Sequence, residues 1–179
     1  MTAKQHTLIG GIAALILSPI LGLGAIPFWI GSVLIDADHY LEFIYHNRLT
    51  DFSLKRMYDY HNTLGGWFSR PEFLNLSIFH TVEFLSLVYI LTIWLGSPML
   101  KAVLWGMQFH LLLDTIHLSR RGILNKRAHS IVEFFIRKER MQRRGSHPFI
   151  VVGKALDVVL QNNPKKLQSK TVCTSKQYD

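Results

Sequence analysis

The sequence has little cysteine and few charges. Its single cysteine, Cys173, lies in a polar C-terminal segment, which excludes a disulfide framework and a thiolate metal site. Charged residues make up 18% of the chain, against about 25% in an ordinary soluble domain, and hydrophobic residues make up 49%. This composition excludes an intrinsically disordered chain and a coiled coil. A length of 179 residues favours one domain with its own core.

Long stretches without charge predict helices that cross a membrane. No Asp, Glu, Lys or Arg occurs in the 31 residues from Gln5 to Ile35, and about 20 apolar residues suffice for one crossing. Glycines and prolines between residues 19 and 27, and again at 96–98, divide the two apolar regions. We therefore expect four helices, at about 6–23, 27–45, 74–95 and 98–118. A signal peptide is the alternative for the first segment, and a soluble bundle is the alternative for the whole, although no polar stripe follows the second apolar region.

The basic residues gather in the C-terminal third. Residues 1–119 hold 6 Lys/Arg and 8 Asp/Glu, whereas residues 120–179 hold 14 and 4. Because Lys and Arg mark the cytoplasmic side of short segments, we expect both termini and the loop at 46–73 in the cytoplasm. The sequence thus predicts an all-α, multi-pass membrane bundle of about four spans over 1–119. A basic peripheral helical region over 120–161, with an amphipathic helix at 126–141, and a disordered tail over 162–179 complete the prediction.

Ionisable side chains inside predicted spans are functional candidates, because burying them in a membrane is costly. They all fall in the cytoplasmic half of the predicted helices. They are His6, Asp36, Asp38, His39, His80, Glu83, His110, Asp114 and His117. At about 100° per residue, His110, Asp114 and His117 share one helix face. Asp38 lies about 200° from Asp36 on a regular helix, so it either supports the site from behind or marks a distorted helix.

Imidazoles and carboxylates from separate helices point to divalent metal binding, because mixed N/O ligand sets suit Zn, Mn, Fe or Ni. Such a site generates a hydroxide nucleophile, and phosphoester hydrolysis is a usual outcome. Haem ligation and ion transport are alternatives. The carboxylates within one turn of most of these histidines favour a divalent ion over haem. Each residue taken singly could be a helix cap or a polar contact. The metal-binding interpretation therefore depends on all of these side chains lying together in one site.

Several motifs resemble the membrane-bound metal-dependent hydrolases of bacteria and archaea, which are regarded as distant relatives of zinc-dependent phospholipase C. The motifs are HTLIG at 6–10, GSVLIDADH at 31–39, HTVE at 80–83 and HLLLD at 110–114. The resemblance covers roughly residues 5–140. It implies a helical inner-membrane protein with a metal centre. His80-Thr81 resembles the second half of the family's His-Arg-x-x-Thr-His-Ser element, and His61-Asn62 resembles its first half, nineteen residues upstream.

The preferred function is metal-dependent hydrolysis of an anionic phosphoester such as a phospholipid. The expected metal ligands are His6, Asp36, His39, His80, His110 and Asp114. Asp38 or Glu83 is the expected general base, and His61 and Arg70, on or beside the basic loop, are expected to hold the substrate. Zinc is the preferred cofactor, with Mn, Fe and Mg as alternatives. Membrane lipids are expected partners and nucleic acid is not, because no base-reading motif is present. A non-enzymatic metal-binding, transport or adaptor protein stays open, as does an oligomer.

Overall fold

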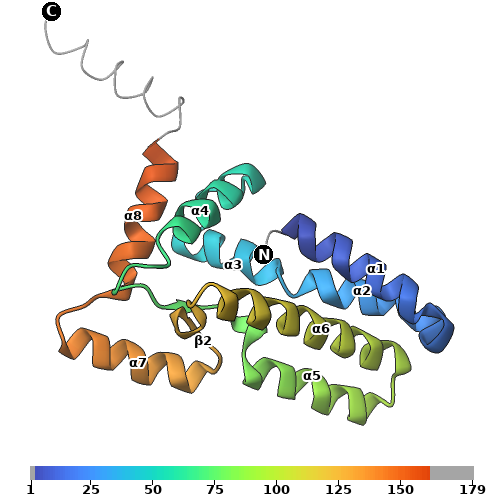
Figure 1. The fold of residues 1–179 in the computed structure, drawn as a ribbon. Helices are drawn as coiled ribbons and strands as arrows, with labels where there is room; N and C mark the ends of the chain where they lie inside the picture. The colour runs from blue at the N-terminus through green and yellow to red at the C-terminus, as the bar shows by residue number, and fades with distance from the viewer. Residues whose placement is uncertain (1–2, 162–179) are drawn as a thin grey trace, which may run out of the picture.

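Helices make up most of the computed structural model, which describes residues 3–161 (Figure 1). The α-helices are α1 (Ala3–Leu21), α2 (Ala25–Leu34), α3 (Ala37–His46), α4 (Leu54–Gly66), α5 (Val82–Leu95), α6 (Pro98–Arg120), α7 (Ile131–Arg143) and α8 (Pro148–Gln161). Three 3₁₀ turns and two short strands complete the fold: η1 (Gly22–Gly24), η2 (Ile78–His80), η3 (Leu124–Lys126), β1 (Asn75–Leu76) and β2 (Arg127–Ala128). The all-α prediction is confirmed. The predicted disordered tail at 162–179 lies outside the described residues.

Two helical hairpins, α1–α2 and α5–α6, form the apolar part of the chain. The local sequence explains both of their turns. Gly22 has φ of 53°, a left-handed conformation that glycine adopts without strain, and it turns α1 back onto α2. Gly96 ends α5 in the same conformation, with φ of 57°. Ser97 then caps α6 by accepting a hydrogen bond from the Leu100 amide at 3.2 Å, and Pro98 occupies the first turn. Both turns lie at the same end of the molecule (Figure 1).

Glycines let the two hairpins approach at backbone distance. A Cβ atom at Gly31 on α2 would collide with the backbone of Val103, and one at Gly106 on α6 would collide with the backbone of Phe28. Gly10 on α1 similarly faces the side chain of Ser32. The carboxyl half of α2 therefore lies directly against the middle of α6, close to Asp36 just beyond α2 and to His110 on α6.

The predicted second helix, 27–45, is broken in the middle. α2 ends at Leu34 and α3 begins at Ala37, with tight hydrogen bonds from the Asp36 amide to the Val33 carbonyl (3.2 Å) and from the His39 amide to the Asp36 carbonyl (3.1 Å). Because this break changes the direction of the chain, Asp36 and Asp38 do not keep the angular separation of a regular helix. The helix is distorted here, which was one of the two open alternatives.

Three further differences separate the structure from the predicted elements. The third helix begins at Val82 rather than about 74, because Thr81 caps it and residues 75–80 form β1 and η2. The loop expected at 46–73 contains α4, and the basic region contains α8 beyond α7. α8 packs on α4 in a core with Phe43, Tyr60 and Phe73.

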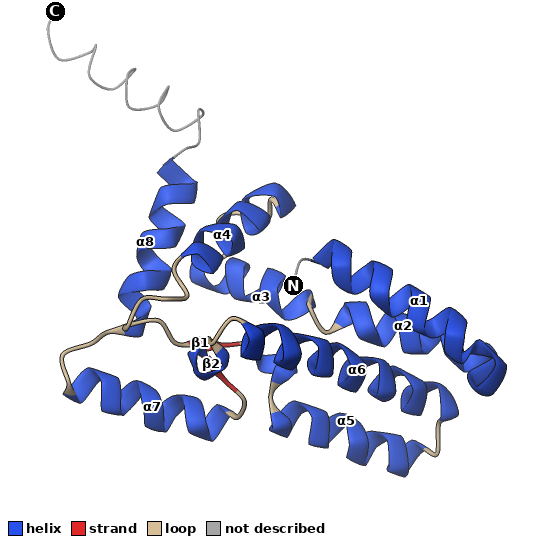
Figure 2. Cartoon of the chain, viewed as in Figure 1, coloured by secondary structure: helices blue, strands red, loops and turns tan. Residues whose placement is uncertain are grey.

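A two-residue parallel ladder joins the basic C-terminal region to the segment before α5. Asn75 pairs with Arg127 and Leu76 pairs with Ala128, so β2 lies beside the segment that leads into α5 (Figure 2). Ser130 then caps α7 by accepting hydrogen bonds from the Val132 and Glu133 amides. This pairing brings Arg127 to the end of α6.

One stretch of the described residues, Lys4–His46, is long and apolar enough to cross a membrane. It folds back on itself at η1, so its two halves lie side by side (Figure 1). α5 is apolar but only 14 residues long. A single candidate of this kind also fits a signal sequence or a core helix, so the four-span bundle stays a prediction.

Candidate metal centre

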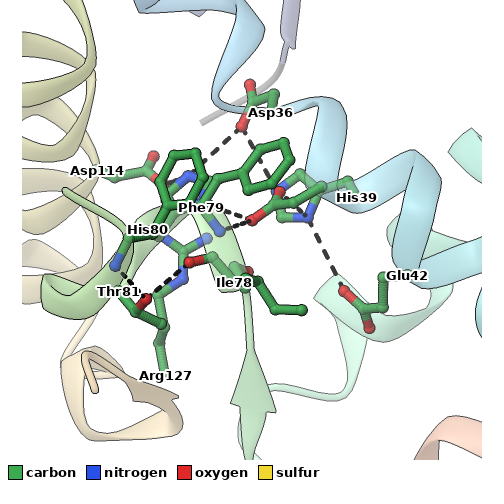
Figure 3. Close-up of polar contacts among 12 residues, drawn as sticks. Asp36, His39, Glu42, Ile78, Phe79, His80, Thr81, Asp114 and Arg127 are labelled. Atoms are coloured by element: carbon green, nitrogen blue, oxygen red, sulfur yellow. Dashed lines mark hydrogen bonds and ion pairs between the residues drawn. The ribbon is translucent and has the colours of Figure 1, made fainter. Parts of the chain in front are cut away.

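Five side chains predicted as metal ligands meet in the structure, and we call them the central cluster. They are His6 from α1, Asp36 from the break between α2 and α3, His80 from η2, and His110 and Asp114 from α6. All but Asp36 are buried. The cluster lies at the opposite end of the hairpins from the two turns (Figures 1 and 3).

Hydrogen bonds decide which nitrogen of each central histidine can bind a cation. His110 Nδ1 lies 2.7 Å from the carbonyl oxygen of Ser32, which can only accept, so Nδ1 carries the proton. His80 Nδ1 lies 2.9 Å from Asp38 Oδ2 and donates to it. When either ring is neutral, its lone pair is therefore on Nε2.

The Nε2 atoms of these two rings converge with carboxylate oxygens. His80 Nε2 and His110 Nε2 are 3.4 Å apart, and Asp36 Oδ1 lies 3.7 Å and 3.3 Å from them. Asp114 Oδ2 lies 3.9 Å and 3.8 Å from the same nitrogens. Zn–N and Zn–O bonds of about 2.0–2.1 Å in a tetrahedron place ligand atoms about 3.3–3.4 Å apart. The triad of Asp36, His80 and His110, whose ligand atoms lie 3.3–3.7 Å apart, therefore fits a divalent cation, with Asp114 beside it.

Asp114 is held from two sides. His6 Nε2 lies 3.0 Å from Asp114 Oδ1, and the His6 ring stacks on the ring of His110 with centroids 3.8 Å apart. Arg127 donates to Asp114 Oδ2 at 2.7 Å. No pattern in the sequence predicts the contact of Arg127 with Asp114, because this contact depends on the β1–β2 pairing. The guanidinium is the one cationic side chain among the labelled residues around the cluster (Figure 3).

Asp38 supports the central cluster from behind. Its Oδ2 accepts from His80 Nδ1 and, at 3.1 Å, from the Phe79 amide. These two bonds fix the ring of His80 and keep its proton on Nδ1. The predicted role of Asp38 as a supporting residue is consistent with this geometry, and its role as general base stays a prediction.

His39 and His61 form a neighbouring group with Glu42, which we call the flanking cluster. One ligand atom from each of the three lies within 4.8 Å of the other two. His39 Nε2 lies 3.5 Å from Asp36 Oδ1, so the two clusters adjoin. His39 was predicted to ligate the central metal, and His61 to bind substrate. Glu42 was missed, although it follows His39 by three residues and so shares its helix face.

The structure does not bring Glu83 and Arg70 to either cluster. The Glu83 carboxylate accepts from Ser130 Oγ and, at 3.1 Å, from the Ile131 amide, so it binds the N-terminus of α7. The predicted role of Glu83 as general base therefore lacks a geometric basis. The Arg70 guanidinium lies 4.0 Å from the centroid of the Trp67 ring, and its carbonyl accepts from Lys126 Nζ at 2.9 Å.

Other polar side chains of the segment 46–73 are engaged in packing and ion pairing within the fold. Tyr60 is fully buried in the core between α4 and α8. Arg56 is paired with Asp51 at 2.6 Å. The basic segment 46–73 thus forms a capped helix, α4, that packs in the core. Of the residues in this segment, His61 belongs to one of the two clusters.

Comparison with known proteins adds no relative. No protein-family model, characterised protein or solved structure matches the chain. The resemblance to membrane-bound metal-dependent hydrolases therefore remains a prediction from the motifs, and the function is inferred from the geometry of the clusters.

Proposed function

We propose that the chain is an inner-membrane, metal-dependent hydrolase of anionic phosphoesters, with zinc as the preferred ion at the central cluster. The observation that carries the proposal is the convergence of two imidazole Nε2 atoms with two carboxylate oxygens, at N–N and N–O distances of 3.3–3.9 Å. The ion would be held by His80, His110, Asp36 and Asp114. His6 contacts Asp114 and so lies beside the ion's position. A divalent ion there would supply Lewis acidity toward a phosphoryl oxygen and a hydroxide nucleophile at neutral pH.

The chain's own groups orient the site and favour an anionic substrate. Ser32 and Asp38 hold the two central histidines by their Nδ1 protons, so the rings keep their direction when a ligand is exchanged. Arg127 brings a guanidinium to the same carboxylate that faces the histidines. A guanidinium fork matches the geometry of phosphate oxygens, which supports a phosphoester as the substrate.

A membrane location is supported by the outer faces of the hairpins. Large apolar side chains there are exposed, among them Leu15 (74%), Ile20 (82%) and Trp94 (78%). A surface of this kind marks a membrane or protein contact. The central cluster and the basic residues lie away from the uncharged turns, so four short spans with both termini in the cytoplasm would put the cluster near head-group depth.

The central prediction is that purified protein carries a divalent metal and hydrolyses phosphoesters. Elemental analysis of the detergent-purified chain should find metal in wild type and clearly less in His110→Ala, because His110 contributes one converging lone pair. Hydrolysis of bis(p-nitrophenyl) phosphate and of phosphatidylglycerol vesicles should fall by at least 100-fold in Asp36→Asn. Glu83→Gln is the matched control, since its carboxylate binds α7, and should keep both metal and turnover.

Two outcomes would separate the alternatives. Metal in wild type without turnover on either substrate would favour a non-enzymatic metal-binding or transport protein. Equal metal in wild type and His110→Ala would contradict the central site itself.

The predicted orientation can be tested with the single cysteine. A membrane-impermeant maleimide should label Cys173 in inverted inner-membrane vesicles and leave it unlabelled in intact spheroplasts, because the C-terminus is expected in the cytoplasm. Cys173→Ser is the control for specificity. Labelling in spheroplasts would overturn the proposed orientation.

A further inference from the structure

Three buried polar atoms without a hydrogen-bond partner face one another beside the central cluster. Four such atoms occur among the described side chains, and three of them are Asp38 Oδ1, His39 Nδ1 and Glu42 Oε2. His39 Nδ1 lies 3.6 Å from Asp38 Oδ1 and 4.0 Å from Glu42 Oε2. Buried polar atoms are nearly always paired, so a group of three unpaired ones requires an explanation.

We propose that the flanking cluster, His39, Glu42 and His61, binds a second divalent cation, with Asp38 Oδ1 facing the same point. The proposal concerns metal binding and does not depend on phosphoester hydrolysis. None of these three residues belongs to the central cluster, so the two sites have separate ligand sets.

The protonation of His39 follows from its neighbours. Its Nε2 faces Asp36 Oδ1 at 3.5 Å, and a carboxylate accepts, so the ring proton belongs on Nε2. Nδ1 then carries a lone pair that faces Glu42 Oε2 and Asp38 Oδ1; Figure 3 shows His39 lying between Asp36 and Glu42. An imidazole whose other nitrogen donates to a carboxylate is the usual form of a metal-binding histidine. Asp36 would thus contact both the central cluster and His39 of the flanking cluster.

Glu42 is held in a similar way. Its side chain is only 10% exposed, and Tyr60 donates to Oε1 at 3.5 Å. This contact leaves Oε2 as the buried oxygen without a partner. A carboxylate beside the core of α3 and α4 has lost most of its hydration, and a cation would compensate for that loss.

His61 supplies the third ligand from a different helix. Its Nε2 lies 2.8 Å from the carbonyl of His39, which can only accept, so the proton is on Nε2 and Nδ1 keeps a lone pair in the neutral ring. Two imidazoles with one or two carboxylates suit Zn²⁺, Mn²⁺, Fe²⁺ or Co²⁺ better than Ca²⁺ or Mg²⁺.

Metal titration of the full chain tests the proposal. Detergent-purified protein is stripped with chelator and titrated with Co²⁺, whose visible absorption reports ligand geometry, and Zn²⁺ displacement is followed in parallel. Wild type should bind two equivalents. Glu42→Gln and His61→Gln should each lose one equivalent, and His110→Ala should lose the other. His129→Gln, an exposed histidine, should still bind two.

The opposite results would overturn the second site. A protonated Glu42 that donates to His39 Nδ1 would also satisfy these atoms, and wild type would then bind one equivalent. Two equivalents in Glu42→Gln would likewise contradict the assignment. Should either variant fail to fold by circular dichroism, wild type decides alone: Zn²⁺ beyond the first equivalent should raise Tm further, and an unchanged Tm would overturn the proposal.

Discussion

Alanine at Gly106 is expected to destabilise the protein by about 3 kcal/mol, at the upper end of the cost of overpacking. A Cβ atom there would collide with the backbone carbonyl of Phe28, and backbone cannot move aside as a flexible side chain can. α2 and α6 must therefore separate. Thermal unfolding in detergent should show Tm lowered by roughly 10 °C for a chain of this size.

The same substitution should also impair metal binding. His110 lies four residues after Gly106 on α6, and its Nδ1 proton goes to the Ser32 carbonyl on α2. Separating the helices stretches this hydrogen bond and moves Asp36 away from the histidines. Gly106→Ala should accordingly bind Zn²⁺ more weakly even at temperatures where it remains folded.

Gly153→Ala is the matched control. Gly153 lies within α8, is exposed, and has open space where a Cβ would be added. Alanine there removes the poor helix propensity of glycine and should raise stability by about 0.5–1 kcal/mol. If Gly106→Ala unfolded at the wild-type temperature, the close approach of α2 and α6 would be contradicted.

The meeting of the central residues could be predicted because it depends on position along helices. His6, Asp36, His80, His110 and Asp114 all fall at the same end of helices that turn back at glycine and proline. Antiparallel hairpins place such residues at one depth whatever their detailed packing. The structure joins these five, and the prediction needed only the turns and the residue spacing.

The break at residues 35–36 could not be predicted in this way. No glycine or proline marks it, and the neighbouring residues favour a continuous helix. The break follows from contacts made by side chains far apart in the chain, with Asp36 reaching His110 at 3.3 Å and Asp38 reaching His80 at 2.9 Å. Tertiary interactions overrode local propensity here.

Two missed helices did carry a signal. Met57, Tyr60 and Leu64 are buried on one face of α4, at helical spacing after the capping residue Ser53. α8 buries residues 151, 155 and 159 at intervals of four. α4 carries Lys55, Arg56 and Asp59 and so is not an apolar run, whereas α8 is apolar but short and lies within the basic region. Arg127 is different, because a two-residue ladder leaves no pattern in the sequence.

Removing the carboxylate of Asp38 is expected to weaken metal binding at the central cluster by about 10- to 100-fold, the usual effect of losing a group that orients a ligand. Asp38 Oδ2 accepts from His80 Nδ1 at 2.9 Å and from the Phe79 amide at 3.1 Å. Without it, the ring of His80 can rotate and its proton can move to Nε2, the nitrogen that faces Asp36 and His110. Asp38→Asn keeps an acceptor oxygen and should fall at the lower end of this range, and Asp38→Ala at the upper end.

The measurement is a Co²⁺ titration in chains that also carry His61→Gln, so that binding at the flanking cluster does not contribute. Asp59→Asn, an exposed aspartate on α4, is the matched control and should leave the affinity unchanged. Wild-type affinity in Asp38→Ala would show that His80 needs no orienting carboxylate. Complete loss in Asp38→Asn, equal to that in His110→Ala, would instead make Asp38 a direct ligand, because only a direct ligand would be so sensitive to replacing a carboxylate oxygen with an amide nitrogen.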